Sequence, residues 1–258
     1  MVSDDKVKPE VEEEEPDPPR NFTLKQLAHF DGTKETRTLR GELVEDEDPK
    51  PVYLSINTIV FDVSDGKNFY GPGGPYENFA GHECGVALAK MSFDETHVDD
   101  LTGIATLKFT EKTDLEGWIE KFTYYRNYPV VGKYVPTSKL PDPDKIWTKE
   151  ELEKHNGVVP DGEEPPEGYA IAPIYIGAGD KVYDVSFGGA SFYGPGGPYA
   201  KFAGRNASRA LAKMSLNIED VENTDVSDLT EKETKILNDW IRRFEGKSGY
   251  PIVGRLQL

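Results

Sequence analysis

Two copies of one seven-residue stretch, Tyr-Gly-Pro-Gly-Gly-Pro-Tyr, carry the residue types of this chain best suited to ligand chemistry. The first copy runs from Tyr70 to Tyr76 and the second from Tyr193 to Tyr199. Glycine and proline are so dense in both that neither a helix nor a strand can pass through. Each copy therefore predicts a rigid loop that holds two tyrosines at a fixed separation.

A tyrosine phenol has an ordinary pKa near 10 and is neutral at neutral pH. Beside a metal ion it can lose its proton and bind as a phenolate, as in haem proteins whose iron is held by tyrosine. Small residues follow each loop, at 80–81 and 203–204, and they would let a flat ligand approach the backbone. The spacing leaves a plainer interpretation open, in which the aromatic rings are core residues and the glycines form a turn.

The surroundings of the two loops also match, which indicates an internal duplication and predicts two domains of one kind. Each loop follows a β-branched run that predicts strands, within 52–63 in the first copy and 174–185 in the second. Each copy begins with a short helix marked by a capping box. The capping pairs are Thr23 with Gln26 and Thr148 with Glu151.

Two helices are predicted after each loop, followed by a short β-like tail. The first helix covers 77–91 in one copy and 200–214 in the other. The second helix carries a Trp and a Phe four residues apart on one face: Trp118 with Phe122, and Trp240 with Phe244. Because strands do not alternate regularly with helices, we expect a small α+β domain and not a doubly wound sheet.

The chain divides into four predicted segments. Residues 1–20 form an acidic tail with too few large apolar residues to order itself. Domain 1 covers 21–134, a linker with three prolines covers 135–145, and domain 2 covers 146–258. Two acidic stretches inside the domains are predicted as loops, at 33–50 and 158–168.

The composition excludes several classes of function. A formal net charge of −17 argues against nucleic acid and anionic membrane surfaces as partners. No window approaches the roughly 20 apolar residues of a membrane-spanning helix, and the single cysteine, Cys84, excludes an internal disulfide. No hydrolase triad order, P-loop or dinucleotide motif is present, so we expect no enzyme activity. We expect a cytoplasmic location, with any association with endomembranes made through partners.

The run Phe-Tyr-Gly-Pro-Gly-Gly-Pro-Tyr-x-x-Phe-Ala-Gly resembles the membrane-associated progesterone receptor family, whose domain is the cytochrome b5-like haem/steroid-binding domain. The resemblance covers 22–134 and 147–256, including the capped helix, the Trp helix and a Tyr-Pro-x-Val-Gly tail. It implies two tandem cytochrome b5-like α+β domains, each with a haem cleft between helices. Tandem domains and the lack of a transmembrane helix are less usual in this family.

The resemblance also implies how each cleft holds its ligand. The axial phenolate ligands of a ferric, non-covalent b-type haem would be Tyr76 and Tyr199. The tyrosines that hydrogen-bond beside them would be Tyr70 and Tyr193, and those at the haem edge would be Tyr128 and Tyr250. The family often has a lysine just before the edge tyrosine, whereas Asn127 and Gly249 stand here, which puts contacts with the haem propionates in doubt.

The two copies are not equal in this comparison. The second keeps the family's Asn-Ala-Ser-Arg run at 206–209, whereas the first has His82-Glu83-Cys84-Gly85-Val86 there and lacks the serine and the arginine. We therefore rank the second copy as the more family-like site. His82 and Cys84 together are not expected to bind a metal, because zinc sites need four ligands. The other histidines, His29, His97 and His155, are expected to face solvent.

Three functions remain open at this stage. The first is a haem-binding protein with tyrosinate ligation that supports mono-oxygenases of sterol metabolism. The second is a steroid-binding or sterol-binding module, or an adaptor, without haem. The third is an electron-transfer protein, which we rank last because an anionic hard donor stabilises ferric iron.

Overall fold

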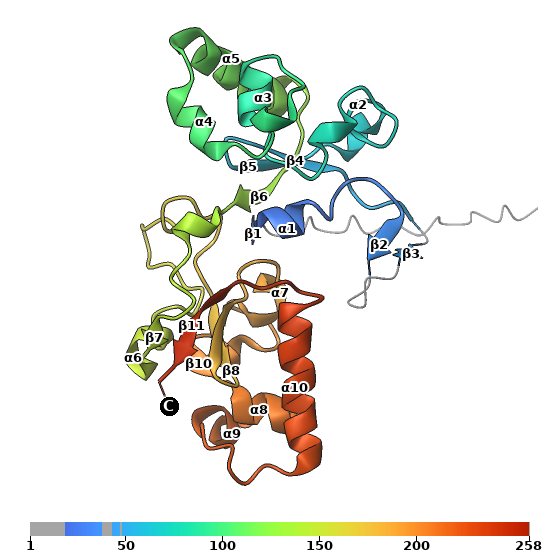
Figure 1. The fold of residues 1–258 in the computed structure, drawn as a ribbon. Coiled ribbons are helices and arrows are strands. Elements are labelled where there is room, and N and C mark those ends of the chain that lie inside the picture. The colour runs from blue at the N-terminus through green and yellow to red at the C-terminus, as the bar shows by residue number, and fades with distance from the viewer. Residues whose placement is uncertain (1–18, 38–42, 47, 258) are drawn as a thin grey trace, which may run out of the picture.

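The computed structural model describes residues 19–37, 43–46 and 48–257, and almost all of the acidic tail expected over 1–20 lies outside the described residues. Figure 1 shows two lobes, one built from the first copy of the duplication and one from the second. The limits predicted for the domains and the linker stay predictions.

The sheet of the first domain has the strand order β1-β6-β5-β4. Its strands are β1 (Arg20–Phe22), β4 (Tyr53–Ile56), β5 (Ile59–Asp62) and β6 (Val130–Tyr134). β1 runs parallel to β6, and the other pairs are antiparallel. The helices of this domain are α1 (Leu24–Leu27), α2 (Lys67–Tyr70), α3 (Gly85–Ala89), α4 (Leu101–Thr106) and α5 (Phe109–Glu120). A π-helical turn, Lys121–Tyr125, continues α5.

The second domain repeats this plan with the strand order β10-β8-β9-β11-β7. Its strands are β7 (Ile146–Trp147), β8 (Tyr175–Ala178), β9 (Lys181–Asp184), β10 (Arg205–Asn206) and β11 (Ile252–Leu256). Its helices are α6 (Lys149–Glu153), α7 (Ala190–Tyr193), α8 (Ser208–Lys213), α9 (Ile218–Glu222) and α10 (Glu231–Glu245). Repetition of the same sheet and helix order confirms the predicted α+β class.

Both predicted capping boxes are confirmed. Thr23 and Gln26 bond each other's backbone at the start of α1, and Thr148 and Glu151 do so at α6. The turn expected at Asn57 is also present, with positive φ angles at Asn57 and at the following threonine. These elements were predictable because their signals lie within a few residues of one another.

The long helices predicted over 77–91 and 200–214 are wrong in their first halves. Each region begins with a single 3-10 turn, Glu77–Phe79 or Ala200–Phe202, and becomes helical again only at α3 or α8. In between, Gly204 has φ +72°, and the next two residues form β10 beside β8. Sheet pairing therefore takes over backbone groups that a continuous helix would have used.

One of the two acidic stretches predicted as loops is partly ordered. Glu35–Arg37 (β2) pairs antiparallel with Leu43–Glu45 (β3), so the loop prediction over 33–50 is wrong for these residues, and 38–42 and 47 lie outside the described residues. The second stretch, 158–168, contains no helix or strand, as predicted. Pairing between two short strands that are not adjacent in the sequence leaves little local signal for a sequence-based prediction.

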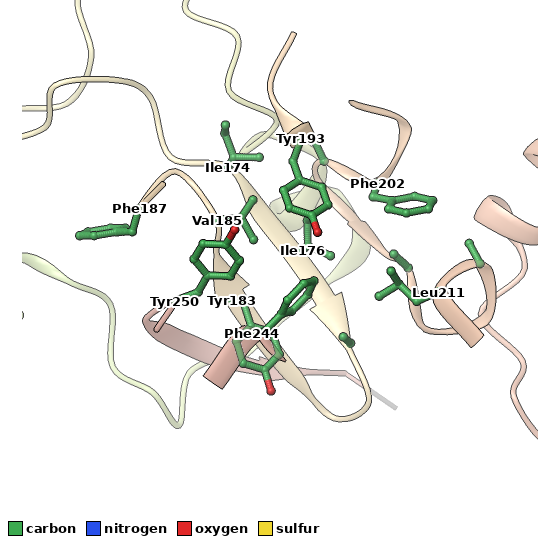
Figure 2. Packing of buried hydrophobic residues seen from close by; sticks show 14 of the residues in the cluster. Ile174, Ile176, Tyr183, Val185, Phe187, Tyr193, Phe202, Leu211, Phe244 and Tyr250 are labelled. Carbon is green, nitrogen blue, oxygen red and sulfur yellow. The ribbon is translucent and has the colours of Figure 1, made fainter. Parts of the chain in front are cut away.

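Each domain has its own aromatic core. In the first, Phe61 and Phe122 are fully buried and pack edge to face with centroids 5.4 Å apart. The second repeats this with Tyr183 and Phe244, also 5.4 Å apart (Figure 2). Val135, the first residue of the predicted linker, is buried in the core of the second domain, so the connection is packed and not a free spacer.

The first domain contacts the second through β1 and α1, which lie between the two lobes (Figure 1). Asn21 is fully buried there, and its amide donates to the carbonyl of Ile171 at 3.2 Å and to Ser186 Oγ at 2.8 Å. Its own Oδ1 accepts from the backbone of Ala170 at 2.7 Å. The two domains are therefore joined by specific hydrogen bonds as well as by the linker.

Candidate functional site

The first tyrosine loop is closed by its own backbone. Tyr70 ends α2, Tyr76 lies just before the 3-10 turn, and the Tyr76 N–H donates to the carbonyl of Phe69 at 2.9 Å. The two tyrosine rings lie with their centroids 5.8 Å apart. The second loop reproduces this arrangement, with Tyr193 and Tyr199 5.9 Å apart. The predicted rigid spacing of each tyrosine pair is therefore confirmed as geometry.

A cavity of about 120 Å³ lies beside the first loop. Its lining combines aromatic rings with two cations: Phe69, Tyr70, Tyr76, Leu88, Trp118, Lys121, Phe122, Arg126 and Tyr128. Three of the six predicted site tyrosines thus meet in one place, although they come from different parts of the fold. The cavity is smaller than a usual ligand pocket, and Phe69 in its lining is exposed to solvent.

A glycine allows the edge tyrosine of the first cleft to reach the loop. A Cβ at Gly66 would lie 2.5 Å from the hydroxyl oxygen of Tyr128 and 3.2 Å from the ring of Tyr70. In the second domain, a Cβ at Gly189 would lie 2.6 Å from the Tyr250 hydroxyl. Both glycines are therefore required for close packing of the tyrosines and not for an unusual backbone angle.

Burial keeps four of the tyrosines in their neutral form. It raises the pKa of Tyr70 and Tyr193 well above the ordinary phenol value, and it raises the pKa of Tyr128 and Tyr250 as well. A neutral phenol keeps its proton and can donate a hydrogen bond. This suits the supporting role expected for these four residues.

Tyr193, Tyr199 and Tyr250 mark the equivalent place in the second domain, here called the second cleft, where the first tyrosine of the loop is more deeply buried than in the first domain. Tyr193 is only 5 % exposed, while Tyr70 is half-buried. Figure 2 shows Tyr193, Phe244 and Tyr250 from three elements gathered at one place, and Phe244 lies 6.1 Å from Tyr193 and 5.5 Å from Tyr250 between ring centroids. The two copies therefore share their tyrosines but differ in the exposure of the first tyrosine of the loop.

Cations at the cleft mouth were missed by sequence reasoning. Lys121 lies 4.3 Å from the ring of Trp118, and Arg126 lies 5.9 Å from the ring of Phe69. In the second domain, Arg243 stands 5.7 Å from the ring of Trp240. Their spacing from the Trp–Phe pair was a usable signal, because one turn of helix separates each from its tryptophan or phenylalanine.

The family-like run of the second copy builds an ion-pair network. Arg209 donates to both carboxylate oxygens of Asp228 and to the carbonyl of Asp225, and it lies 3.5 Å from Asp220. Its guanidinium lowers the pKa of Asp228 to about 2. In the first copy Val86 occupies the equivalent position, and a weaker pair, His82 with Asp99 at 2.8 Å, stands nearby. The predicted difference between the copies therefore has a structural basis.

The remaining histidines and the cysteine do not gather into a metal centre. Across the described ranges, no group of three or more His, Cys, Asp and Glu side chains could hold a metal ion. Cys84 is buried and its thiol contacts the carbonyl of Phe79 at 3.4 Å. The expectation that His155 faces solvent is wrong, because its ring stacks on Tyr175 with centroids 4.2 Å apart.

A second pocket, of about 160 Å³, lies elsewhere in the second domain. Trp147, Leu152, Val221 and Leu256 form its apolar part, and none of the six tyrosines lines it. It is larger than the tyrosine cavity. Its lining also carries polar side chains such as Lys149, Arg205 and Asn206, but no tyrosine that could supply an anionic oxygen ligand. We therefore place the candidate site at the tyrosines.

The residues of the first cleft fit a haem on chemical grounds. A phenol on the wall can supply an anionic oxygen ligand, a neutral phenol beside it can donate a hydrogen bond, and two cations at the mouth can meet carboxylates. The aromatic lining accepts a flat macrocycle. In this arrangement Tyr76 would hold the iron and Tyr70 would support it, with Tyr199 and Tyr193 in the second cleft.

Fold and site together define a small α+β domain that occurs twice, with a tyrosine-bearing loop in each copy and a cavity beside the first loop. The family model "Cytochrome b5-like Heme/Steroid binding domain" matches residues 40–135 and 148–245. The chain therefore belongs to the cytochrome b5-like haem/steroid-binding domain family, and it carries two such domains.

Three relatives illustrate this family. Probable steroid-binding protein 3 from Arabidopsis thaliana is 46 % identical over 110 residues, which are 43 % of this chain and 96 % of that protein. Cytochrome P450 regulator dap1 from Schizosaccharomyces pombe is 31 % identical over 153 residues, 57 % of this chain and 82 % of that protein. Membrane-associated progesterone receptor component 2 from Homo sapiens is 29 % identical over 138 residues, 53 % of this chain and 54 % of that protein.

These matches confirm the resemblance on which the sequence analysis relied. The names of these relatives describe binding proteins, a receptor component and a regulator. Within the part of the chain that the structure describes, no helix is long and apolar enough to cross a membrane.

Proposed function

We propose that this protein binds ferric haem non-covalently in its two cytochrome b5-like clefts, with Tyr76 and Tyr199 as the iron ligands. The observation that carries this proposal is the meeting of Tyr70, Tyr76 and Tyr128 around one aromatic cavity with Lys121 and Arg126 among its lining residues. The second domain repeats the tyrosine pair at nearly the same spacing.

Different residues of the chain would contact different parts of such a ligand. Bound ferric iron would supply the positive charge that favours the phenolate form of tyrosine. Tyr70, whose pKa is raised by burial, would keep its proton and could donate a hydrogen bond toward the phenolate oxygen of Tyr76. Lys121 and Arg126, which line the cavity, would meet the carboxylates of the ligand, since Asn127 stands where the family often has a lysine.

We assign the protein an accessory role in haem and sterol metabolism, in support of haem mono-oxygenases. The relative named as a cytochrome P450 regulator supports this assignment. A hard anionic oxygen donor stabilises ferric over ferrous iron, which disfavours rapid electron shuttling. Binding, delivery or regulation of haem is therefore the role that we propose, and not catalysis by this chain.

Addition of hemin to the purified protein tests this function. We expect saturable binding, a high-spin ferric absorption spectrum and a reduction potential well below that of a bis-histidine cytochrome b5. A potential as high as that of a bis-histidine protein would instead support electron transfer. Absence of hemin binding would contradict the proposed function.

A steroid or sterol is the second candidate ligand. The apolar lining of the first cleft and the name of the steroid-binding relative favour it. Progesterone binding in the absence of haem, with loss of binding in Trp118→Ala, would support this alternative. If hemin displaces progesterone, both ligands share one cleft.

A further inference from the structure

Arg20 belongs to β1 of the first domain, yet its guanidinium lies against the second domain. Its Nη2 atom donates to the carbonyl of Phe187 at 3.1 Å. A Cβ at Gly188 would lie 2.6 Å from Cζ of Arg20, so the guanidinium occupies the space that a side chain at position 188 would need. An arginine of one domain is therefore built into a loop of the other.

This loop borders the tyrosines of the second domain. Gly188 is followed directly by Gly189, where a Cβ would lie 2.6 Å from the Tyr250 hydroxyl and 3.0 Å from the ring of Tyr193. Gly188, which packs against the Arg20 guanidinium, is thus the direct neighbour of Gly189, which packs against both tyrosines. The positive charge of Arg20 also acts on Tyr250, where it opposes the rise in pKa caused by burial.

The first cleft has a cation at a position where the second copy has none. There Arg126 stands two residues before the edge tyrosine Tyr128, whereas Ser248 stands two residues before Tyr250. Asp65 precedes the glycine that contacts Tyr128, whereas Gly188 precedes the equivalent glycine of the second cleft. The second copy therefore has a glycine where the first has an acid, and Arg20 of the first domain joins Arg243 as a cation that acts on the edge tyrosine.

Neighbouring hydrogen bonds fix Arg20 in this place. Gln26 Nε2 donates to the carbonyls of Phe187 and Ser248, both at 2.8 Å. The guanidinium also lies 4.4 Å from the ring centroid of Phe22. Since Phe187 precedes α7 and Ser248 precedes Tyr250, β1 and α1 contact the segments that lead to Tyr193 and Tyr250.

We propose that the second cleft is a composite site, in which Arg20 of the first domain and Arg243 of α10 together bind a carboxylate of a planar, largely apolar ligand. A guanidinium presents paired N–H donors that match the two oxygens of a carboxylate. The proposal takes the shape of the ligand from the proposed function, but it does not depend on iron ligation.

Metal-free protoporphyrin IX and its dimethyl ester test the proposal in the full chain. The two compounds have the same macrocycle, and the ester lacks the carboxylate charge. The chain has three tryptophans, and their indole N–H signals in nuclear magnetic resonance spectra report each cleft separately. Trp118 reports the first cleft, Trp240 reports the second, and Trp147 lies in neither.

For Arg20→Gln we expect the affinity that Trp240 reports for protoporphyrin to fall about tenfold, which is the size of a lost charge-assisted hydrogen bond. Affinity for the dimethyl ester and the affinity at Trp118 should not change. Arg126→Gln should weaken protoporphyrin binding at Trp118 alone. Arg242→Gln, an exposed arginine paired with Asp239, is the matched control and should alter neither cleft. Arg20→Lys keeps the charge and should lose less than Arg20→Gln.

Two results would overturn the composite site. One is an unchanged affinity at Trp240 in Arg20→Gln, and the other is an equal loss for protoporphyrin and its ester, which would make Arg20 purely structural. The proposed function fails separately if hemin binds no more tightly than metal-free protoporphyrin. No porphyrin binding at Trp240 in the wild type would reject both.

Discussion

At the scale of single residues, Glu83 explains how the first copy tolerates loss of the family-like Asn-Ala-Ser-Arg run. Its buried carboxylate accepts hydrogen bonds from Ser55 Oγ and from the backbone of Asn57, Thr58 and Gly85. In the second copy, shorter Asn206 bonds Ser208, and Ser208 Oγ accepts from the turn at Gly179. Glu83 in the first copy therefore makes the hydrogen bonds to the turn that Asn206 and Ser208 make together in the second copy.

This substitution predicts a compensating pair. Glu83→Ala leaves four donors without their acceptor and should lower the free energy of unfolding by about 2–4 kcal/mol. A Cβ at Gly85 would lie 2.8 Å from Glu83 Oε1, so Gly85→Ser alone should also destabilise. In urea unfolding, the double variant Glu83→Asn/Gly85→Ser should recover at least half of the stability that Glu83→Ala loses. A double variant that loses as much stability as Glu83→Ala and Gly85→Ser together would contradict the exchange of Glu83 and glycine for asparagine and serine.

Asp184 predicts a pH dependence of stability. It is fully buried, its Oδ2 has no hydrogen-bond partner among the described residues, and burial raises its pKa to about 7. The folded state therefore binds this proton more tightly than the unfolded chain, and stability falls as pH rises from about 4 to 7. Asp184→Asn should be more stable than the wild type at pH 8, by at most roughly 4 kcal/mol.

Thermal unfolding at pH 5 and pH 8 checks this expectation. The difference between the two pH values should shrink in Asp184→Asn. Asp62→Asn is the matched control from the first copy, because Asp62 is half-buried and bonds Ser64 in the same way. An equal effect of both substitutions would show that burial of Asp184 is not the cause.

At the scale of elements, short-range signals predicted the fold well. The capping boxes, the hairpins and the Trp–Phe helices were predictable because each signal lies within one turn or one strand pair. The helices over 77–91 and 200–214 were overextended, because the pairing of Arg205–Asn206 with β8 depends on residues 29 positions away. Arg20 was missed because only tertiary packing places it beside the second domain, whereas Lys121 and Arg126 had a local signal in their helical spacing from Trp118 and Phe122.

Gly66 provides a test of cleft geometry at this scale. Gly66→Ala introduces a Cβ 2.5 Å from the Tyr128 hydroxyl oxygen without requiring a left-handed backbone. We expect a loss of about 1–3 kcal/mol of stability from overpacking, together with weaker ligand binding at the first cleft only. Calorimetry and the Trp118 signal would measure the two effects.

Gly117→Ala is the control for this prediction. Gly117 lies inside α5 with open space where its Cβ would be. Alanine there should stabilise the helix by up to about 1 kcal/mol and leave ligand binding unchanged. If Gly66→Ala behaved like Gly117→Ala, close contact at Tyr128 would not matter for the cleft.

At the scale of the whole molecule, the buried amide of Asn21 couples the two domains. Asn21→Ala removes bonds to Ile171, Ser186 and Ala170, and should cost about 1–3 kcal/mol. We expect one cooperative unfolding transition in the wild type to separate into two in this variant, as seen by calorimetry. Two transitions already present in the wild type would show that the domains unfold independently.

We propose above that each domain holds one haem through its own tyrosine. The most direct measurement is a hemin titration of the wild type, Tyr76→Phe, Tyr199→Phe and the double variant, followed by absorption. We predict two equivalents with a high-spin ferric spectrum in the wild type, one in each single variant and none ligated in the double variant. An unchanged spectrum and stoichiometry in the double variant would contradict tyrosinate ligation in both domains.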